Sequence, residues 1–385
     1  MTVTCAVCSK PFGAPIFESS EAKSLTTMNV LIDGKTTVYF CDNCHHGQTN
    51  ELPDLVTYYD QEYEINIDSE ESDQLYDVVD GKEVYRSEHQ ARVLMSKVDL
   101  SQHRKVLDYG CAKAPTLRAI CSKIPEVEPY LFDVTDKYVR FWAKFSEEPN
   151  WATHTPDPDW KGQMDVVLSF YALEHIPRLT DILTEVRDLL KEGGYFYFIV
   201  PDMYQNAADF IVADHVNHFS TQSLWHLMAK NGFTDIEIDT EAHASAYVVS
   251  AHRAASDAPM PTPPDFVDKT SEALALAQFW HDIKVRISSF EAKVSPDVPL
   301  VIYGAGIYGN FIFSCLKNPK KVTHFLDQNT FLAGTKIHGC PIITPDDLLY
   351  DSAAILVGLN PRNARRIIED IKSLKNASHT FLFLS

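Results

Sequence analysis

The sequence predicts an α/β protein in which two doubly wound units follow a small N-terminal metal-binding module. Short apolar runs alternate with amphipathic stretches from Arg104 onward, which is typical of a doubly wound sheet. The alternation resumes after a proline-rich segment at 255–266, and two Cys-x-x-Cys pairs precede both units. The length of 385 residues agrees with this division, because a domain averages about 150 residues.

The composition is that of a folded globular protein, with 45% apolar and 23% charged residues. The 34 Lys and Arg against 53 Asp and Glu give a net charge of −19, so nucleic acids and anionic membrane surfaces would be repelled. No apolar run is long enough to span a membrane, and the first ten residues lack the apolar core of a signal peptide. We therefore expect a cytoplasmic protein that binds neither nucleic acid nor membranes.

Half of the eight cysteines form two Cys-x-x-Cys pairs, namely Cys5, Cys8, Cys41 and Cys44. In a reducing compartment, two such short loops can place four thiolates tetrahedrally around one zinc ion. A redox dithiol is the alternative, but a redox motif normally opens a helix in a βαβ context, which is absent here. His45 and His46 lie beside Cys44 as possible substitute ligands. A shell of four sulfurs leaves no position for a catalytic water, so we expect the zinc to be structural.

Four segments are expected along the chain. Residues 1–80 hold the zinc module and an acidic, Tyr-rich connector, which is either a solvated linker or a lid over a substrate. Residues 81–254 form the first α/β domain, and 255–266 form a linker whose four prolines exclude a regular helix or central strand. Residues 267–385 contain a long helix, expected up to Lys293, and the second α/β domain.

The first α/β domain is expected to contain a regular succession of elements. Apolar spacing predicts helices over 82–98, 178–191 and 221–230, with Gly193-Gly194 stopping the second helix. Buried runs predict strands at 105–109, 129–133, 164–170 and 195–200, and a closing pair at 234–242 and 244–253.

A possible nucleoside-binding site follows the first of these strands. A turn of small residues there lets backbone amides approach a ligand; it contains Asp108, Tyr109, Gly110 and Ala112. The next strand ends at Asp133, 25 residues after Asp108. A carboxylate at that place can accept hydrogen bonds from both hydroxyls of a ribose.

The string DVVLSFYALEHIPRLTDILTEVRDLLKEGGYFYFIVPD resembles the corresponding region of class I S-adenosylmethionine-dependent methyltransferases. The resemblance implies that Gly110 and its neighbours line the methionine part of the cofactor and that Asp133 holds the ribose. It also implies that Phe170 to Glu174 flank the adenosyl and sulfonium groups. Ala112 and Ala114 stand where this family often has glycines.

The four-cysteine module, the proline linker and the segment from Asp209 to Ser220 together resemble the nucleotide-sugar C-methyltransferases of deoxysugar biosynthesis. The resemblance implies that Asp214 and His215 supply the base, with His218 at an aromatic position of that family. Histidine suits this role because its pKa of about 6.5 lets it accept a proton near neutral pH. His215 would remove the proton next to a sugar carbonyl, or serve an O-methyl transfer from a hydroxyl. Alternatively, both histidines only approach a helix that Ser220 caps.

The second α/β domain opens with a glycine motif. Gly304, Gly306 and Gly309 have G-x-G-x-x-G spacing between a strand and a helix, and Asp327 ends the next strand. The spacing alone fits a dinucleotide site. The sugar methyltransferases that the chain resembles carry a C-terminal Rossmann-like domain without a redox role, and this resemblance implies that the loop, with Tyr308, faces a nucleotide-sugar or is only a tight turn.

Three functions remain open at this stage. The first is a methyltransferase that uses S-adenosylmethionine and structural Zn²⁺, with a nucleotide-activated sugar between the middle and C-terminal domains. The second is an NAD(P)-dependent sugar oxidoreductase built around Gly304 to Asp327. The third is a degenerate methyltransferase that acts as a binding module, which Ala112, Ala114 and Val212 suggest because they replace residues usual in the family.

Overall fold

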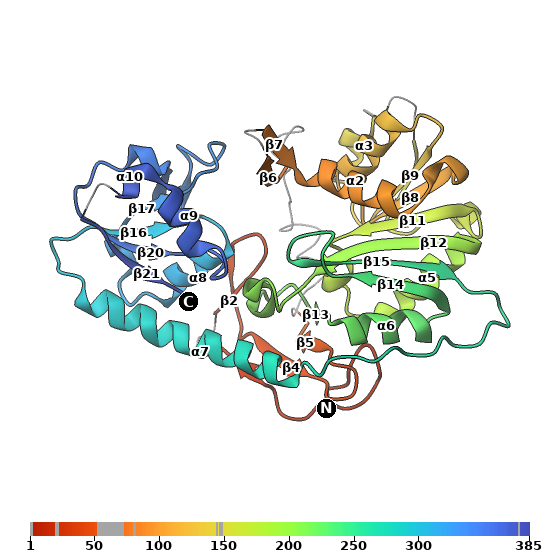
Figure 1. The fold of residues 1–385 in the computed structure, drawn as a ribbon, viewed down its shortest axis with the longest axis horizontal. Coiled ribbons are helices and arrows are strands. Elements are labelled where there is room, and N and C mark those ends of the chain that lie inside the picture. Colours follow the sequence, from red (N-terminus) through yellow and green to blue (C-terminus); the bar gives the residue numbers. More distant parts are fainter. Residues whose placement is uncertain are drawn as a thin grey trace. The chain divides into compact units, whose positions relative to one another are not determined.

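A computed structural model describes residues 3–19, 23–51, 73–79, 82–143, 145, 149–375 and 378–385 (Figure 1). The chain divides into two compact units. The N-terminal unit comprises 1–15, 39–205 and 215–270, and the C-terminal unit comprises 16–38, 206–214 and 271–385. The acidic, Tyr-rich connector, expected to be a linker or a lid, lies mainly in 52–72, outside the described residues, and both interpretations stay predictions.

A seven-stranded sheet in the order β10-β9-β8-β11-β12-β15-β14 forms the centre of the N-terminal unit. Its strands are β8 (Lys105–Tyr109), β9 (Glu128–Asp133), β10 (Asn150–Thr153), β11 (Met164–Phe170), β12 (Leu190–Pro201), β14 (Phe233–Asp239) and β15 (Ala246–Arg253). Neighbours pair in parallel except at β15, which is antiparallel to both β12 and β14. Because β8 has β9 on one side and β11 on the other, its carboxyl end is the switch point at which such sheets bind ligands.

Helices cover both faces of this sheet (Figure 1). They are α2 (Arg86–Lys97), α3 (Pro115–Lys123), α4 (Val139–Trp142), α5 (Leu179–Leu189) and α6 (Thr221–Lys230). Successive strand residues point to opposite faces, so Leu107 joins the apolar core under α5 and α6 while Val106 joins the core under α2, α3 and α4. The sheet and the helices on its two faces form a three-layer arrangement, which holds the ends of the strands in place.

Two local predictions differ from the structure. The helix expected from residue 82 begins at Arg86, because Lys82–Tyr85 forms β7, which pairs with β6 (Leu75–Val79). The string KEVY contains the β-branched Val84 and the aromatic Tyr85, which favour strands, so it fits a strand as well as a helix. The second helix ends at Leu189, and the two glycines expected to stop it lie inside β12. The pairing of β12 with β11 shifts register there, so the glycines occupy an irregularity of the strand.

Short strands complete the N-terminal unit. β5 (Gly47–Thr49) pairs antiparallel with β13 (Asn217–His218), while β4 (Thr37–Phe40) runs from one unit into the other. A Cβ atom at Gly47 would lie 3.0 Å from the Cβ of His218. Glycine therefore lets the two strands approach each other closely.

A six-stranded sheet in the order β18-β19-β17-β16-β20-β21 forms the centre of the C-terminal unit. Its strands are β16 (Leu300–Tyr303), β17 (Val322–Leu326), β18 (Lys336–Ile337), β19 (Cys340–Ile343), β20 (Ala354–Val357) and β21 (Thr380–Phe383), of which only β18 is antiparallel to its neighbour. Its helices are α7 (Thr270–Lys293), α8 (Ile307–Cys315), α9 (Ala364–Asp370) and α10 (Lys372–Lys375). The antiparallel pairing of β1 (Phe17–Glu18) with the first two residues of β4, and the hairpin of β2 (Lys23–Leu25) with β3 (Leu31–Asp33), also belong to this unit.

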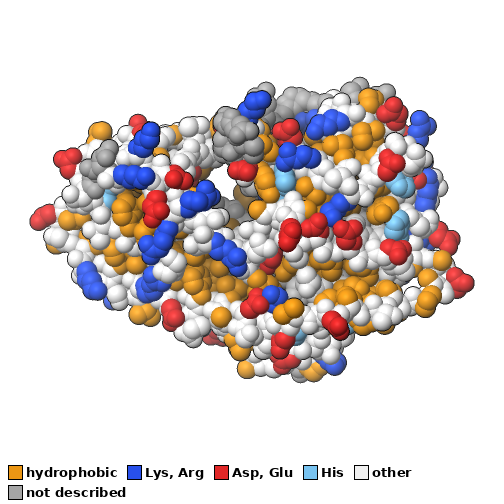
Figure 2. All heavy atoms as spheres, viewed as in Figure 1, with side chains coloured by type: hydrophobic (Ala, Val, Ile, Leu, Met, Phe, Trp, Pro, Cys, Tyr) orange, Lys and Arg blue, Asp and Glu red, His pale blue; other side chains and the backbone are white. Residues whose placement is uncertain are grey.

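The two parts of the sequence carry different charge. Residues 271–385 contain 12 Lys and Arg and 10 Asp and Glu, so the large negative charge of the chain lies in residues 1–270. Figure 2 shows Lys and Arg side chains spread between Asp and Glu over the surface of the C-terminal unit. Among the described helices, none has the length and apolar character needed to cross a lipid bilayer.

Candidate active site and zinc centre

A cavity of about 820 Å³ opens at the carboxyl ends of β8, β9 and β11 in the N-terminal unit. Six of the seven residues predicted to bind the cofactor line it: Asp108, Tyr109, Gly110, Ala112, Asp133 and Phe170. The seventh, Glu174, is fully buried and is not among the lining residues. A volume of this size suits a small organic ligand or cofactor.

The turn between β8 and α3 has left-handed backbone conformations. Gly110 has φ 74°, and a Cβ atom there would approach the side chain of Ala172 to 3.1 Å. Ala112 and Ala114 also have positive φ, at 46° and 52°. Because alanine occupies this region at a cost of roughly 1–2 kcal/mol, the two residues that replace family glycines are strained. The turn keeps the conformation that glycines would adopt freely.

Asp133 is fixed by the same turn. Its Oδ2 accepts a hydrogen bond from the Ala112 N–H at 2.8 Å, and its Oδ1 accepts one from the Thr135 N–H at 3.2 Å. Burial raises the pKa of Asp133 to about 6, although these backbone hydrogen bonds act in the opposite direction and lower it. Near neutral pH the carboxylate is ionised and faces the cavity, as a ribose-binding acid must.

Asp108 offers a second acidic group to the cavity. Its side chain is 2% exposed, and its Oδ1 has no hydrogen-bond partner among the described residues. Burial, and then the nearby Asp133 carboxylate, raise the pKa of Asp108 to about 8. A ligand with positive charge would relieve both effects. The two carboxyl groups of the cavity therefore fit S-adenosylmethionine. Its ammonium and sulfonium are positively charged, and the hydroxyls of its ribose can donate hydrogen bonds.

We expect Asp108→Asn to change the pH dependence of stability. The folded state keeps the Asp108 proton up to about pH 8, whereas an unfolded Asp loses it near pH 3.9. The folded state thus binds more protons between these values, so the stability of the ligand-free protein falls as the pH rises through this window. The Asp108→Asn variant has no carboxyl group to ionise at this position, so it should not lose this stability. Calorimetry over a pH series should show that its unfolding temperature exceeds that of the wild type most at about pH 8.

Asp239→Asn provides a control of opposite sign. The hydrogen bond from Lys97 lowers the pKa of Asp239 to about 2, so its stabilisation is present above the unfolded pKa and is lost as the pH falls. This variant should lose stability near neutral pH. Parallel pH profiles for the wild type and Asp108→Asn would show that Asp108 is not a buried neutral acid.

A buried cluster of Glu174, His175 and His215 reaches the cavity through one of its members. One ligand atom of each residue lies within 4.8 Å of the others, and the rings of His175 and His215 meet edge to face with centroids 4.6 Å apart. His175 lines the cavity, and it comes from the short 3₁₀ helix Leu173–His175 that follows β11. The predicted base His215 therefore touches the cavity only through His175, a histidine for which the sequence predicts no role.

The other two residues predicted to act in catalysis have partners elsewhere. The Asp214 carboxylate accepts a 2.8 Å hydrogen bond from the Thr27 N–H and another from the Thr27 hydroxyl. His218 is fully buried in β13, where its Nε2 lies 2.8 Å from the Thr49 hydroxyl. The carboxylate grouped with His215 is that of Glu174.

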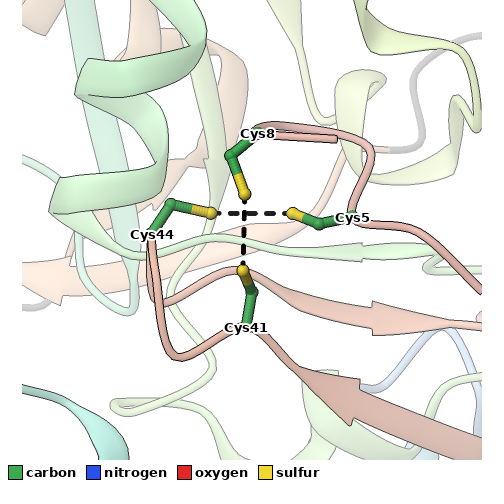
Figure 3. Close-up of side chains that lie close together, drawn as sticks. All are labelled: Cys5, Cys8, Cys41 and Cys44. Atoms are coloured by element: carbon green, nitrogen blue, oxygen red, sulfur yellow. Dashed lines mark hydrogen bonds between the residues drawn. The ribbon is translucent and has the colours of Figure 1, made fainter. Parts of the chain in front are cut away.

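The four predicted zinc ligands converge in the N-terminal unit (Figure 3). The Sγ atoms of Cys5 and Cys44 are 3.6 Å apart, and those of Cys8 and Cys41 are 3.5 Å apart. Tetrahedral coordination with Zn–S bonds of about 2.3 Å puts sulfurs about 3.8 Å apart. The four sulfurs thus fit one zinc ion, which would bind them as thiolates and fill its shell.

The two loops that carry these sulfurs have the same backbone geometry. In the first, the Cys5 carbonyl accepts from the Ser9 N–H at 2.9 Å; in the second, the Cys41 carbonyl accepts from the His45 N–H at 2.8 Å. Ser9 and His45 both have positive φ, at 63° and 55°. The Nε2 atom of His46 lies 3.2 Å from Asn217 Oδ1, so His46 contacts β13.

In the C-terminal unit, packing accounts for two of the three motif glycines. A Cβ atom on Gly304 would lie 2.3 Å from the Gly358 carbonyl oxygen, and one on Gly309 would lie 1.9 Å from that of Gly304. Gly306 has open space around the position of a Cβ atom. Asp327 accepts the Ala305 N–H at 2.9 Å, which parallels the contact of Asp133 with its own glycine turn.

Tyr308 is largely buried. Its hydroxyl donates to Asn206 Oδ1 at 2.9 Å and accepts from the Ala208 N–H at 3.0 Å, both within the same unit. These contacts anchor the start of α8 to the segment 206–214.

Comparison with known proteins identifies one family. A family model described as a methyltransferase domain matches residues 84–238. No curated protein matches the chain. Solved structures that resemble it include the CurJ carbon methyltransferase, with 17% identity, a TM-score of 0.36 and coverage of 42% of this chain and 51% of that one. Human N-acetylserotonin methyltransferase in complex with SAM has 16% identity, a TM-score of 0.38 and coverage of 44% and 54%.

A SAM-dependent methyltransferase from Archaeoglobus fulgidus has 17% identity, a TM-score of 0.36 and coverage of 44% of this chain and 95% of that one. The chain thus spans about half the length of the first two structures. The matched segment extends from β7 into β14, and it contains the glycine turn, Asp133 and the cavity-lining His175. Residues 84–238 form a class I S-adenosylmethionine-dependent methyltransferase domain.

Proposed function

We propose that the chain transfers a methyl group from S-adenosylmethionine to a carbon atom of a nucleotide-activated keto-deoxysugar. The observation that carries the choice of chemistry is the Glu174, His175 and His215 cluster, whose member His175 lines the proposed cofactor cavity. Carbon methylation needs a base that removes a proton next to a carbonyl group, and paired imidazoles backed by a carboxylate suit that task.

The residues around the cavity would have different roles in the reaction. When bound, S-adenosylmethionine supplies an electrophilic methyl group. Asp133 would hold the ribose, and the turn at Gly110 lets backbone amides lie close to the cofactor. His175 would accept the acceptor's proton at the cavity wall, and His215 would orient it and share the charge. Catalysis then relies on positioning and one proton transfer, which together account for large rate effects in other enzymes.

The C-terminal unit is proposed to bind the nucleotide part of the acceptor. Three features support this: a glycine turn at the carboxyl end of β16, an acid at the end of the next strand, and a nearly balanced charge in residues 271–385. An anionic diphosphate would be repelled less there than by the acidic remainder of the chain. Zinc is proposed to hold the four-cysteine module together, and the proposed location is the cytoplasm.

Ligand titration tests this function against the oxidoreductase alternative. We expect S-adenosylhomocysteine to raise the unfolding temperature, because a ligand at 100 times its Kd stabilises the folded state by about 2.7 kcal/mol. NADH should leave it unchanged. Asp133→Ala should lose the response to S-adenosylhomocysteine, whereas Asp327→Ala should retain it. A response to NADH alone would contradict the proposal.

A further inference from the structure

The short 3₁₀ helix that carries His175 is held by the side chain of one buried residue, Asn217. The Asn217 Nδ2 group donates a hydrogen bond to the Leu173 carbonyl at 3.0 Å and another to the Ile176 carbonyl at 2.8 Å. These carbonyls belong to the first residue of the 3₁₀ helix and to the residue that follows it. Because the two bonds use both N–H groups of the amide, Asn217 holds the helix at both ends.

A second buried residue fixes the orientation of the Asn217 amide. Its nitrogen donates to two carbonyls, so its Oδ1 atom faces His46, whose Nε2 atom lies 3.2 Å away. An amide oxygen can only accept a hydrogen bond, so His46 donates from Nε2. Asn217 is 1% exposed and His46 is fully buried. A flipped amide would bring its oxygen against two carbonyl oxygens, which is unfavourable in a buried place, so one orientation is strongly favoured.

His46 is fixed by the four-cysteine module. It is the second residue after Cys44, and its carbonyl accepts a 2.9 Å hydrogen bond from the Cys41 N–H. Its ring packs against that of Phe219, with centroids 5.5 Å apart. The backbone of the second Cys-x-x-Cys loop therefore holds His46, and through it Asn217.

The same module also holds the segment that follows His215. The chain leaves the second Cys-x-x-Cys loop as β5, which pairs with β13. At this pairing the Thr49 N–H donates to the Val216 carbonyl at 3.1 Å, and the Thr49 hydroxyl lies 2.8 Å from His218 Nε2. All of these residues belong to the N-terminal unit. The module is thus linked to both segments that carry the paired histidines, His175 and His215.

We propose that Asn217 is a positioning residue for the proton transfer, and that the four-cysteine module fixes it through His46. The inference rests on the proposed function, in which His175 accepts the acceptor's proton. His175 lines the cavity, whereas Asn217 and His46 are not among the described lining residues. They therefore act through the 3₁₀ helix and not on the ligands. The module then does more than stabilise the fold, because it sets how the two histidine rings meet.

Asn217→Ala removes both hydrogen bonds to the 3₁₀ helix. We expect kcat to fall by roughly 10- to 100-fold, because a small displacement of a catalytic group can cost that much. The affinity for S-adenosylhomocysteine should change far less, since Asp133 and the turn at Gly110 stay in place. The kcat is measured with saturating ligands at a temperature where circular dichroism shows every variant folded. A purely structural role would lower the unfolding temperature and leave this kcat unchanged.

Asn231→Ala is the matched control. Asn231 is also buried, and its Nδ2 donates to the Leu227 carbonyl at 2.7 Å, near the end of α6. Neither residue is among the described lining of the cavity. This variant should lose stability and keep its kcat.

A pair of variants at His46 tests the other hydrogen bond of the amide. His46→Leu should lower kcat, whereas His46→Gln should recover most of the loss, because a glutamine amide can donate from about the position of the imidazole Nε2. Both variants should keep the wild-type zinc content, which separates their effect from loss of the metal. This pair also decides the matter if Asn217→Ala does not fold.

The ring contact of His175 with His215 can be measured without turnover, as nuclear Overhauser effects between their ring protons. The contact should be present in the wild type and in Asn231→Ala, and lost in Asn217→Ala and His46→Leu. Wild-type kcat or an unchanged ring contact in folded Asn217→Ala overturns the inference, as does wild-type kcat in His46→Leu. A fall in kcat explained by loss of S-adenosylhomocysteine binding also overturns it. If the wild type transfers no methyl group, the proposed function fails, and the ring contact still decides whether Asn217 holds the histidines together.

Discussion

His215→Gln is expected to lower kcat by about 10²- to 10⁴-fold, the usual contribution of general-base catalysis, because His215 orients the base His175 and shares its charge. Glutamine keeps the size and polarity of the side chain but cannot take up a proton. His175→Gln should have an effect of similar size, since His175 lines the cavity and its ring touches that of His215. Because the two act as one unit, the double variant should lose little more than either single variant.

The proton-transfer step can be measured without methyl transfer. With S-adenosylhomocysteine bound, the wild type should exchange the proton next to the acceptor's carbonyl group with deuterium from solvent, as NMR would detect. Both glutamine variants should lose this exchange while keeping their affinity for S-adenosylhomocysteine. His103→Gln, a control at a partly buried histidine outside the cavity lining, should retain it. Wild-type exchange rates in His175→Gln and His215→Gln would remove both histidines from the mechanism.

The second large effect is expected at the four-cysteine site. Cys5→Ser combined with Cys8→Ser should reduce the zinc content from about one ion per chain to none, and should strongly destabilise the N-terminal unit. Zinc binding contributes roughly 10–16 kcal/mol of apparent free energy in small zinc domains. Cys5, Val7, Cys41 and Cys44 belong to the same apolar core as α5 and α6, so unfolding of the module would expose that core to water.

Metal analysis and thermal unfolding would measure both consequences. Cys121→Ser is a suitable control, because Cys121 is a partly buried thiol on α3, outside the cluster. It should keep the zinc and most of the stability. Zinc retained at wild-type level in the double variant would show that other residues bind the metal.

Much of the fold follows from local sequence patterns. The strands ending at Tyr109 and Asp133 and the two halves of the Cys-x-x-Cys site are visible because buried apolar runs and ligand spacing are local signals. The start of α2 was missed because KEVY suits either structure, and pairing with β6 decides it. The glycines of β12 were assigned to a helix end, since only the register shift against β11 reveals their place in the strand.

The candidate site was only partly predictable for a different reason. Asp133 could be placed because the end of the strand after a glycine turn is a fixed position in a doubly wound sheet. Glu174 and His175 are adjacent in sequence, yet the 3₁₀ turn puts only His175 on the cavity wall. The contact of Arg86 with the Tyr171 ring has no sequence signal, because the two residues lie 85 positions apart in the chain. Such tertiary contacts leave no periodic trace in the chain.

The measurement that tests the account most directly is transfer of a labelled methyl group. The protein would be incubated with S-adenosylmethionine carrying a ¹³C methyl group and with a nucleoside-diphosphate keto-deoxysugar, and the product would be examined by ¹³C NMR. We predict a labelled methyl group bonded to a sugar carbon next to the carbonyl group. Label on an oxygen atom, or no transfer by a protein that binds S-adenosylhomocysteine, would contradict the proposed function.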